Sequence, residues 1–373
     1  MEIDLSALEH NFAEIRKVTS PSAGIMAVVK ADAYGHGAYE VARTLLDCGA
    51  AGLCLATMDE AVDLRRRGIT APMLTLGYTD KSRYADAVKF EIDQAVYSYD
   101  IARALSDEAV RQNKTIRCHF KLDTGMGRIG FKADGSDTEE IVRCCKLPGI
   151  VPYGVFSHFA VADTDDDEYT RRQYEDFISQ IESLEAKGIH FEKRHICNSA
   201  GIMRFPEMHL DLVRAGIILY GLMPPGCPEP PVKLDLKPVM TWYAKVIHVK
   251  RIAAGDSVSY GRHFTAEAET EVATVGIGYA DGLSRRLSNG FELIVDGVRC
   301  PIIGNVCMDM CMVDTTALTT RPKVGDIVMV FGKDRLADEL ADCIGTINYE
   351  ITCVVGKRVR RIYVKDGAPI QII

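Results

Sequence analysis

The chain has 373 residues, of which 47% are hydrophobic and 26% are charged, and this ordinary globular composition excludes a disordered or fibrous protein. Its 44 Lys and Arg against 52 Asp and Glu give a net charge of −8, so no overall basic field favours nucleic acid or an anionic membrane surface. At roughly 100–200 residues per domain, the length predicts two domains, or one barrel and a smaller module.

The sequence gives no sign of a membrane span, a secretory signal or a metal site. No apolar run approaches the ~20 residues that a membrane helix needs, and the first residues are acidic where a signal peptide would be basic and then apolar. The 12 cysteines include no C-x-x-C pair, and Cys307 and Cys311 lack the further ligands of a zinc site. We therefore expect a cytoplasmic protein with reduced thiols and no metal.

The first two-thirds of the chain alternate short apolar runs with amphipathic segments. One such segment opens with Thr57 and Glu60, the pair of a helix capping box. The amphipathic segments predict helices over Ser6–Val18, Thr57–Arg67 and Glu168–Lys187. The apolar runs predict eight strands, over Ile25–Val29, Gly52–Ala56, Met73–Leu76, Gln94–Tyr97, Arg117–Leu122, Val151–Ser157, Lys193–Cys197 and Leu210–Arg214.

This succession of strands and helices predicts an α/β fold. Strands that are mostly followed by a helix imply right-handed crossovers and a parallel sheet, and continuous apolar runs are typical of strands covered on both faces. Eight such units in about 220 residues fit a closed (β/α)8 barrel of the TIM type. A doubly wound open sheet is the alternative, but no G-x-G-x-x-G signature follows the first strand.

A proline-rich stretch, MPPGCPEPPVKLDLKP at 223–238, predicts an irregular connector between two domains. We place these domains at residues 1–235, the barrel, and 236–373, a smaller and mostly β C-terminal domain. Asp296-Gly297 between apolar flanks predicts a hairpin turn. Short β-type runs beyond the connector predict strands over Tyr243–Arg251, Val272–Gly278, Glu292–Val295, Ile327–Phe331 and Arg360–Val364.

Polar residues stand where the predicted barrel strands end, and the carboxyl ends of such strands carry the active site of a barrel enzyme. Lys30 closes the first strand. A lone lysine there would more often reach solvent at the rim, but a desolvated amine suits Schiff-base chemistry. The ends of later strands add Arg128, His158, Asn198, Ser199 and Arg214. Together these groups predict a ligand pocket at one mouth of the barrel.

The segments after the seventh and eighth strands predict a phosphate site. Backbone amides near Ser199 and Gly216 lie where barrels of this kind often bind phosphate, and glycine lets the backbone approach the anion closely. A Schiff-base lysine combined with a phosphate site suggests pyridoxal phosphate as cofactor.

Eight motifs in order along the chain carry a family resemblance. They are AVVKADAYGHG (27–37), KLDTGMGRIGF (121–131), HICNSAG (195–201), VRAGIILYG (213–221), VSYG (258–261), IGYADG (277–282), GNVCMDMCMVD (304–314) and INYE (347–350). In these motifs the chain closely resembles the bacterial alanine racemases, pyridoxal-phosphate enzymes of fold type III, over essentially its full length.

The resemblance implies roles for the residues around the cofactor. Lys30 would bind pyridoxal phosphate covalently and act as the base on one face of the substrate. Tyr260, from the neighbouring subunit, would be the base on the opposite face. Arg214 would face the pyridine nitrogen, and His158 would link Tyr260 to Arg214. The phosphate would be bound by Tyr34, Ser199, Gly216, Ile217 and Tyr349.

The resemblance also implies residues for the substrate and its access. Arg128 and the amide of Met308 would hold the substrate carboxylate. Lys121 resembles the lysine that is often carbamylated in the family and that neutralises Arg128. Tyr279 would narrow the access channel. Asn198, Cys307 and Asp309 are the remaining supporting positions.

The function implied in this way is the interconversion of L-alanine and D-alanine by two bases in a homodimer whose active sites lie at the subunit interface, supplying D-alanine for peptidoglycan. A serine or broad-specificity amino-acid racemase of the same family is the alternative. A non-catalytic pyridoxal-phosphate-binding barrel would lack the second domain and its Tyr260. A two-domain decarboxylase would carry a glycine-triplet phosphate loop and a Cys-Asp motif, which are not evident here. No nucleic-acid or membrane partner is expected.

Overall fold

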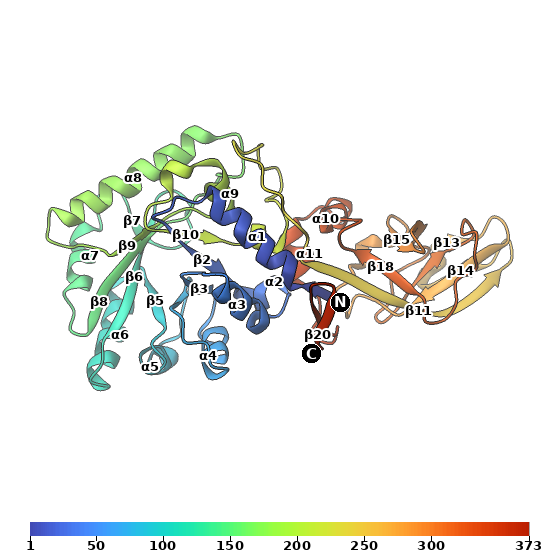
Figure 1. Cartoon of the computed structure of the whole chain (residues 1–373), viewed down its shortest axis with the longest axis horizontal. Helices are drawn as coiled ribbons and strands as arrows, with labels where there is room; N and C mark the ends of the chain where they lie inside the picture. The colour runs from blue at the N-terminus through green and yellow to red at the C-terminus, as the bar shows by residue number, and fades with distance from the viewer. Residues whose placement is uncertain (373) are drawn as a thin grey trace. The chain divides into compact units, whose positions relative to one another are not determined.

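The computed structural model describes residues 1–372, and the chain divides into two compact units. The barrel unit comprises Leu8–Ala33 and Gly37–Leu236, and the sheet unit comprises Met1–Ala7, Tyr34–His36 and the residues from Lys237 onward. The elements of both can be followed in Figure 1. No helix in residues 1–372 has the length and apolar character needed to cross a membrane.

Eight parallel strands form the wall of the barrel unit, paired in the order β10-β2-β3-β4-β5-β6-β8-β9. Backbone hydrogen bonds from Arg214 N to Cys197 O (3.0 Å) and from Asp211 N to Arg194 O (3.1 Å) join the last strand to the first of this order. The (β/α)8 barrel predicted from the sequence is confirmed, nearly closed in the structure, and the open doubly wound alternative is wrong. The strands are β2 (Gly24–Val28), β3 (Gly52–Leu55), β4 (Met73–Thr75), β5 (Asp93–Val96), β6 (Ile116–Asp123), β8 (Ile150–Phe156), β9 (Lys193–His195) and β10 (Leu212–Ala215), with the short β7 (Phe131–Lys132) beside β6.

Helices follow most of these strands and bury one face each. Thr57 caps α4 in a complete capping box with Glu60, as the sequence predicts. The helices are α1 (Leu5–Val18), α2 (Lys30–Tyr34), α3 (Ala38–Asp47), α4 (Met58–Arg66), α5 (Tyr84–Lys89), α6 (Tyr99–Arg111), α7 (Thr138–Cys145), α8 (Asp167–Glu185) and α9 (Ser199–Arg204), with short 3-10 turns at Lys81–Arg83, Pro206–Met208 and Ile217–Tyr220.

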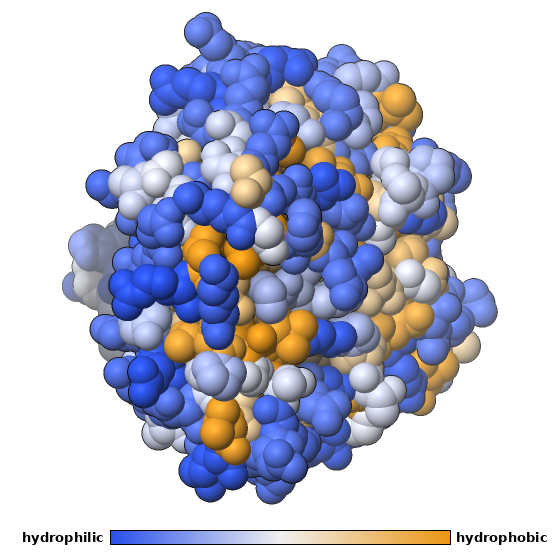
Figure 2. Space-filling model, turned by 90° about the vertical axis from the view of Figure 1, so that its left-hand side faces the viewer, coloured by the Kyte–Doolittle hydropathy of each residue, from blue (hydrophilic) through white to orange (hydrophobic). Residues whose placement is uncertain are grey.

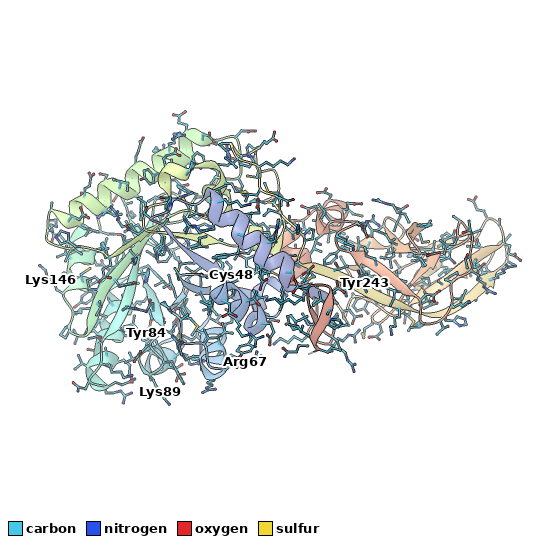
Figure 3. All side chains as sticks on the ribbon, viewed as in Figure 1. Cys48, Arg67, Tyr84, Lys89, Lys146 and Tyr243 are labelled. Atoms are coloured by element: carbon cyan, nitrogen blue, oxygen red, sulfur yellow. The ribbon has the colours of Figure 1, made fainter. Side chains whose placement is uncertain are left out.

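The outward faces of these helices are polar. The face of the molecule drawn in Figure 2 is largely hydrophilic, with small apolar patches between the polar side chains. Arg67, Lys89 and Lys146 are exposed and lie on the outside of the barrel unit (Figure 3). Amphipathic helices thus turn their polar faces to the outside of the barrel. A few polar residues are instead buried, among them His119, Lys121, His195 and Arg214.

The sheet unit is mostly β, as predicted, and is built on a sheet in the order β16-β15-β18-β11-β1-β19-β20, with β14 pairing with both β11 and β17. The first residues of the chain take part, since β1 pairs antiparallel with β11 and parallel with β19. The strands are β1 (Glu2–Asp4), β11 (Met240–Ile252), β12 (Ser257–Val258), β13 (Phe264–Thr265), β14 (Thr270–Val275), β15 (Glu292–Val295), β16 (Val298–Pro301), β17 (Cys311–Asp314), β18 (Ile327–Phe331), β19 (Ile362–Lys365) and β20 (Ala368–Ile372). Helices α10 (Ala337–Ile344) and α11 (Asn348–Cys353) and 3-10 turns at Tyr260–Arg262 and Arg285–Leu287 complete the unit.

The predicted hairpin joins β15 and β16. Asp296 and Gly297 adopt φ values of 50° and 75°, and positive φ at both central residues matches the twist of the flanking strands. The Asp-Gly signal is confirmed.

Residues Tyr34–His36 are held within the sheet unit although they follow the first barrel strand in the sequence. Arg361 Nη2 donates to Gly35 O (3.3 Å) and Tyr363 Oη donates to His36 O (3.1 Å). Gly35 has a φ of +84°, and a Cβ added there would lie 2.2 Å from the carbonyl oxygen of Thr352. Only glycine fits this close approach to α11.

Replacing Gly35 by alanine therefore tests how this segment is held. Gly49 is a matched control, because its φ is +97° and nothing lies within 4 Å of an added Cβ. We expect Gly49→Ala to lower the free energy of unfolding by about 1–2 kcal/mol through backbone strain alone. Gly35→Ala should cost about 1–3 kcal/mol more because of the clash, as measured by urea unfolding. Equal losses in the two variants would contradict the close approach.

Candidate active site

The lysine predicted at the end of the first barrel strand opens a left-handed turn. Ala31, Asp32 and Ala33 have φ values of 53–54°, and Tyr34 continues the run at 54°. Non-glycine residues in this conformation cost roughly 1–2 kcal/mol each and persist only where the surroundings enforce them. Such strain directly after Lys30 points to a functional segment. This turn is not predicted from the sequence, because residues 31–34 include no glycine.

Several hydrogen bonds enforce the turn. Ala33 N donates to Val29 O (2.9 Å), and Ala38 N donates to Asp32 Oδ1 (2.8 Å). Glu60 accepts from Ala31 N through Oε1 (2.6 Å), while its Oε2 accepts from the amides of Ala56 and Thr57, directly before α4. The capping-box partner of Thr57 thereby also fixes the backbone next to Lys30.

We expect Glu60→Ala to lower the free energy of unfolding by about 1–3 kcal/mol, because it removes a helix cap and the acceptor of the Ala31 amide together. Hydrogen exchange at the Ala31 amide should accelerate in the same variant. Asp63→Ala, on the exposed side of the same helix, should change the stability by less than about 0.5 kcal/mol. Unchanged exchange at Ala31 in Glu60→Ala would refute this role.

Lys121, near the end of β6, is buried, with 2% of its surface exposed. Its Nζ donates to Leu122 O (2.9 Å) and lies 5.3 Å from the centre of the Phe156 ring. Burial, reinforced by the positive charge of Arg214, lowers the pKa of Lys121 to about 7. At slightly alkaline pH the amine is therefore mostly neutral.

This shift predicts a pH dependence of stability. In the unfolded chain Lys121 has an ordinary pKa of 10.5, against about 7 in the folded chain. Between these values the unfolded state binds more protons, so this group makes folding more favourable as pH rises, by up to about 1.4 kcal/mol per pH unit. Below pH 7 its unfavourable contribution is constant.

Urea unfolding from pH 6.5 to 9, in buffer freed of carbon dioxide, measures this effect for the free amine of Lys121. The stability of the wild type should rise with pH relative to Lys121→Met, which lacks the titrating amine. Lys132→Met, at an exposed position, should follow the wild type. Parallel curves for the wild type and Lys121→Met would rule out the shift.

The loop after β6 carries Arg128. Asp123 Oδ1 accepts from the amides of Gly125 and Gly127, both at 3.0 Å, and a Cβ at Gly130 would meet the amide nitrogen of Asp123 at 2.5 Å. The loop is thus folded tightly onto Asp123. Arg128 itself is exposed.

Arg214, in β10, is the most unusual charge in the barrel unit, with 3% of its surface exposed. Its guanidinium donates to Ser157 O (2.7 Å) and Ile196 O (2.9 Å) and contacts ring nitrogens of His195 (2.8 Å) and His158 (3.3 Å). Among the residues that the structure describes, no carboxylate pairs with it. Burial lowers the pKa of Arg214 to about 10, so it remains a cation at neutral pH. A buried cation without a counter-charge is a strong mark of a functional site.

Both histidines beside Arg214 are held in the neutral form. Burial first, and then the positive charge of Arg214, hold the pKa of His158 and of His195 well below the usual range. The sequence reading gave His158 a role but missed His195, although it opens the motif HICNSAG. The available signal was its place at the end of a predicted barrel strand, directly before the apolar pair Ile196 and Cys197.

The predicted phosphate-binding segments lie together in the barrel unit. Asn198 caps α9 by accepting from Gly201 N (3.0 Å), and Ser199 Oγ accepts from Gly216 N (3.0 Å). Ser199, Gly216 and Ile217 are all buried. The side-chain oxygen of Ser199 thereby joins the segment after β9 to the one after β10.

The sheet unit holds the other predicted residues. Tyr260 is 69% exposed, yet its backbone is fixed, since Asn305 Nδ2 donates to Tyr260 O (2.6 Å) and Ser259 Oγ donates to Asn305 O (2.6 Å). Ser259 has a φ of 68°. This strained, well-tethered turn presents an aromatic ring to the outside, which an ordinary structural turn does not require.

Two further loops of the sheet unit lie against each other. Tyr279 N donates to Cys307 O and Ala280 N donates to Met308 O, both at 3.0 Å. Arg358 joins them by donating to Asp281 Oδ1 (2.7 Å) and Asp309 Oδ1 (2.8 Å). The side chains of Tyr279 and Met308 are exposed, as is that of Tyr260. Three exposed groups predicted for the site therefore come from interconnected loops of this unit.

Tyr34 and Tyr349, both predicted to bind phosphate, lie side by side in the sheet unit with ring centres 6.0 Å apart. Lys30, Lys121, Arg128, His158, Asn198, Ser199, Arg214, Gly216 and Ile217 lie in the barrel unit. Tyr34, Tyr260, Tyr279, Cys307, Met308, Asp309 and Tyr349 lie in the sheet unit.

Comparison with known proteins identifies the family of the chain. The model of the alanine racemase N-terminal domain matches residues 3–224, and that of the alanine racemase C-terminal domain matches residues 239–363. The chain is 45% identical to an alanine racemase of Clostridium tetani over 371 residues, covering 98% of this chain and 95% of that protein. It is 42% identical to one of Methanococcus maripaludis over 366 residues, covering 97% of each.

Solved structures give the same result. The structure superposes on alanine racemase of Clostridium difficile with a TM-score of 0.96 at 37% identity, covering 100% of this chain and 97% of that one. Alanine racemase of Bacillus anthracis with bound L-Ala-P gives a TM-score of 0.92 at 36% identity, covering 100% and 96%.

Proposed function

Because the chain belongs to the alanine racemase family of isomerases, we propose that it interconverts L-alanine and D-alanine with pyridoxal phosphate held in the barrel unit. The observation that carries this proposal is Arg214, a buried cation with no carboxylate partner among the described residues. A guanidinium can only donate hydrogen bonds. It therefore fits a ring nitrogen that accepts one, as the unprotonated nitrogen of a pyridine does.

The rest of the barrel unit fits the same cofactor. The aldehyde of pyridoxal phosphate would be held by the Lys30 amine, and its phosphate by the segments of Ser199, Gly216 and Ile217. The family resemblance adds Tyr34 and Tyr349 as further phosphate ligands. When bound, the cofactor supplies an electron sink that makes the α-carbon of the amino acid acidic. We further propose that Lys121, whose pKa is lowered to about 7, reacts with carbon dioxide to form a carbamate with release of a proton, and that this anion neutralises Arg128.

Racemisation needs one base on each face of the α-carbon. Lys30 would hold or move the proton on one face through its amine nitrogen, and Tyr260 would do so on the other through its phenol oxygen. His158 would link Tyr260 to Arg214. Arg128 and the amide of Met308 would bind the substrate carboxylate. Arg214, which can only donate hydrogen bonds, would leave the facing nitrogen of a bound pyridine unprotonated, and the weaker electron sink would favour simple proton exchange over other reactions of the same cofactor.

We propose that Tyr260 serves the neighbouring subunit of a homodimer. The exposure of Tyr260 (69%) and Met308 (53%) on tethered loops supports this, since exposed apolar side chains on ordered segments are typical of interfaces. In this arrangement residues 1–235 bind the cofactor, and residues 236–373 supply Tyr260 and Met308 to the partner, with Tyr279 narrowing the access channel and Asn198, Cys307 and Asp309 in support.

We place the enzyme in the cytoplasm, where D-alanine would be made for peptidoglycan. All twelve cysteines are free thiols in the structure, which supports a reducing compartment.

Two variants and their mixture test the proposal. Lys30→Ala should lose the visible absorbance of the bound cofactor, and both Lys30→Ala and Tyr260→Phe should lower racemisation of alanine by about 10²–10⁴-fold. In a purified heterodimer of the two variants, one site combines both defects while the other has neither. That heterodimer should regain about half of the wild-type activity.

The outcomes separate the parts of the proposal. Persistent racemisation and absorbance in Lys30→Ala would refute the role of Lys30. An inactive heterodimer would mean that Lys30 and Tyr260 act within one subunit. Side-by-side kinetics with alanine, serine and lysine would contradict the substrate assignment if either of the other amino acids gave the higher kcat/KM.

A further inference from the structure

A line of buried polar side chains runs through the interior of the barrel and ends at Arg214. Arg214 Nη1 lies 2.8 Å from His195 Nδ1, and His195 Nε2 lies 2.9 Å from His119 Nδ1. His119 Nε2 in turn lies 3.6 Å from Asp93 Oδ2, and Asp93 Oδ1 accepts from Arg117 Nε (2.8 Å). Asp93, His119, His195 and Arg214 are each no more than 4% exposed.

The chemistry of its two ends gives this line a direction. A guanidinium has only donors, so His195 Nδ1 must be the acceptor toward Arg214. A neutral His195 then carries its proton on Nε2 and donates to His119 Nδ1. His119, with Nδ1 accepting, carries its own proton on Nε2, directed at the carboxylate of Asp93. At 3.6 Å this last contact is electrostatic rather than a full hydrogen bond.

The reverse direction is incompatible with the observed position of Arg214. If His195 carried its proton on Nδ1, two N–H groups would face each other at 2.8 Å, and the Arg214 guanidinium would have to move away from the ring. The low pKa of His195, caused by burial and by Arg214 and His119, equally disfavours a doubly protonated ring. One neutral tautomer of His195 therefore satisfies the geometry.

Packing fixes the positions of the two histidine rings. The His195 ring stacks on Phe156, with centres 5.0 Å apart and planes inclined by 6°. His119 occupies space left open by Gly154, where an added Cβ would lie 2.2 Å from His119 Nδ1. With both rings fixed, the position of the proton is the remaining freedom.

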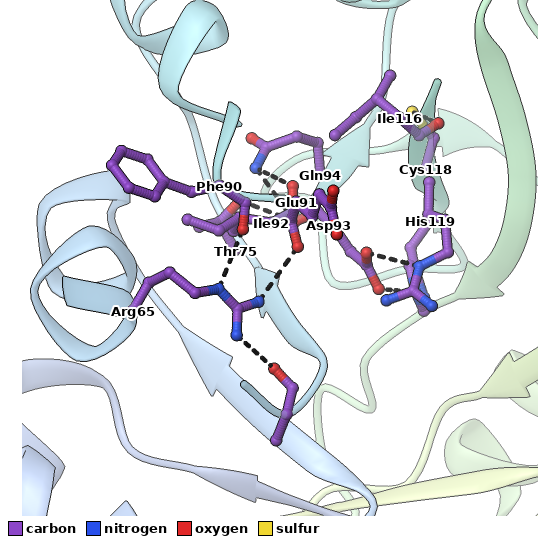
Figure 4. A network of polar contacts seen from close by, with 12 residues as sticks. Arg65, Thr75, Phe90, Glu91, Ile92, Asp93, Gln94, Ile116, Cys118 and His119 are labelled. Atoms are coloured by element: carbon purple, nitrogen blue, oxygen red, sulfur yellow. Dashed lines mark hydrogen bonds and ion pairs between the residues drawn. The ribbon is translucent and has the colours of Figure 1, made fainter. Parts of the chain in front are cut away.

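Asp93 is the carboxylate at the outer end of the line. Its contact with His119 can be followed in Figure 4. Asp93 and Arg117 also line a cavity of about 1200 Å³ that includes the residues at the starts of β5, β6 and β8. The outer end of the line is thus beside solvent, and its inner end is buried.

We propose that Asp93, acting through His119, is a positioning residue that keeps the proton of His195 on Nε2, so that the Nδ1 lone pair holds the Arg214 guanidinium in place. Its effect on racemisation rests on the proposed function, in which Arg214 faces the pyridine nitrogen. The tautomer of His195 does not depend on that function.

Asp93→Ala removes the carboxylate that faces His119 and so fixes the direction of the line. Asp93→Asn keeps an amide oxygen that can face His119. Arg117, which loses its ion pair in both variants, can turn into the cavity. Asp211→Ala is the matched control, because Asp211 also binds an arginine near the start of a barrel strand (Arg194, 2.8 Å) but contacts neither histidine in the described structure. The three variants are compared with the wild-type holoenzyme by nitrogen-15 NMR of the histidine rings. The His195 signal is assigned by its loss in His195→Gln.

In the wild type, His195 should show a protonated Nε2 and a bare Nδ1. Asp93→Ala should give a mixture of both tautomers, because no carboxylate then favours a proton on His119 Nε2. It should lower kcat/KM by about three- to tenfold, the effect of losing the Arg214–His195 hydrogen bond. Asp93→Asn should restore the wild-type tautomer and remain within about twofold in kcat/KM. Asp211→Ala should lower the thermal stability without changing the His195 tautomer or kcat/KM.

Three outcomes would overturn the proposal: a protonated Nδ1 of His195 in the wild type, an unchanged tautomer in Asp93→Ala, or an equal change in Asp211→Ala. If Asp93→Ala does not fold, the His195 tautomer in the wild type and in Asp93→Asn still tests the proposal. A chain that neither binds pyridoxal phosphate nor racemises alanine, but whose His195 tautomer follows Asp93, would refute the proposed function alone. An active racemase whose tautomer ignores Asp93 would refute this inference alone.

Discussion

The burial of Arg214 without a carboxylate partner is the constraint on which the interior of the barrel depends. Taking a guanidinium out of water is expensive unless each donor meets an acceptor. Here the acceptors are main-chain oxygens of Ser157 and Ile196 and a ring nitrogen of His195. Such oxygens become available where β8 and β9 end, because the ladder of the parallel sheet no longer uses them. The cation is therefore satisfied at the mouth of a barrel.

This constraint extends into the surrounding core. His195 can serve Arg214 only if its other nitrogen is satisfied, which requires His119, and His119 requires the space beside Gly154. Phe156 then fixes one ring by stacking. Each residue thus supplies a hydrogen-bond partner or a packing contact that the previous one still needs. A buried polar network is stable only when all of its members are satisfied in this way.

The sequence predicts most of the fold because the relevant signals are local. Apolar runs locate the eight barrel strands to within a few residues, and Thr57 with Glu60 marks the start of α4. By contrast, the pairing of β1 with β19 joins residues at opposite ends of the chain, which no local pattern reveals. The left-handed turn after Lys30 escaped because Ala-Asp-Ala lacks the glycine that usually marks such a conformation.

In the candidate site, too, residues marked by a local signal were predicted, and residues defined by contacts between distant strands were not. The residues at the strand ends were found because their position in a barrel already suggests chemistry, and the roles given to them remain predictions. Asp93 and His119 were not predicted, because they lie at the start of β5 and in the middle of β6, whereas active-site residues of a barrel are expected at the carboxyl ends of its strands. Inward-facing polar residues in apolar strands were the available signal. Their meaning depends on distances between strands that are far apart in the sequence.

The electrostatics of the barrel follow from one permanent charge. Arg214 keeps its proton, and because no carboxylate among the described residues offsets it, its field and the low polarity around it disfavour any second cation nearby. The pKa values of Lys121, His158 and His195 are all lowered. Burial and an uncompensated arginine thus keep the neighbouring bases neutral near neutral pH, so that the ring nitrogens of His158 and His195 can accept hydrogen bonds. A carboxylate paired directly with Arg214 would weaken that effect, so Asp93 is better placed at the far end of the line, where it can orient protons without cancelling the charge.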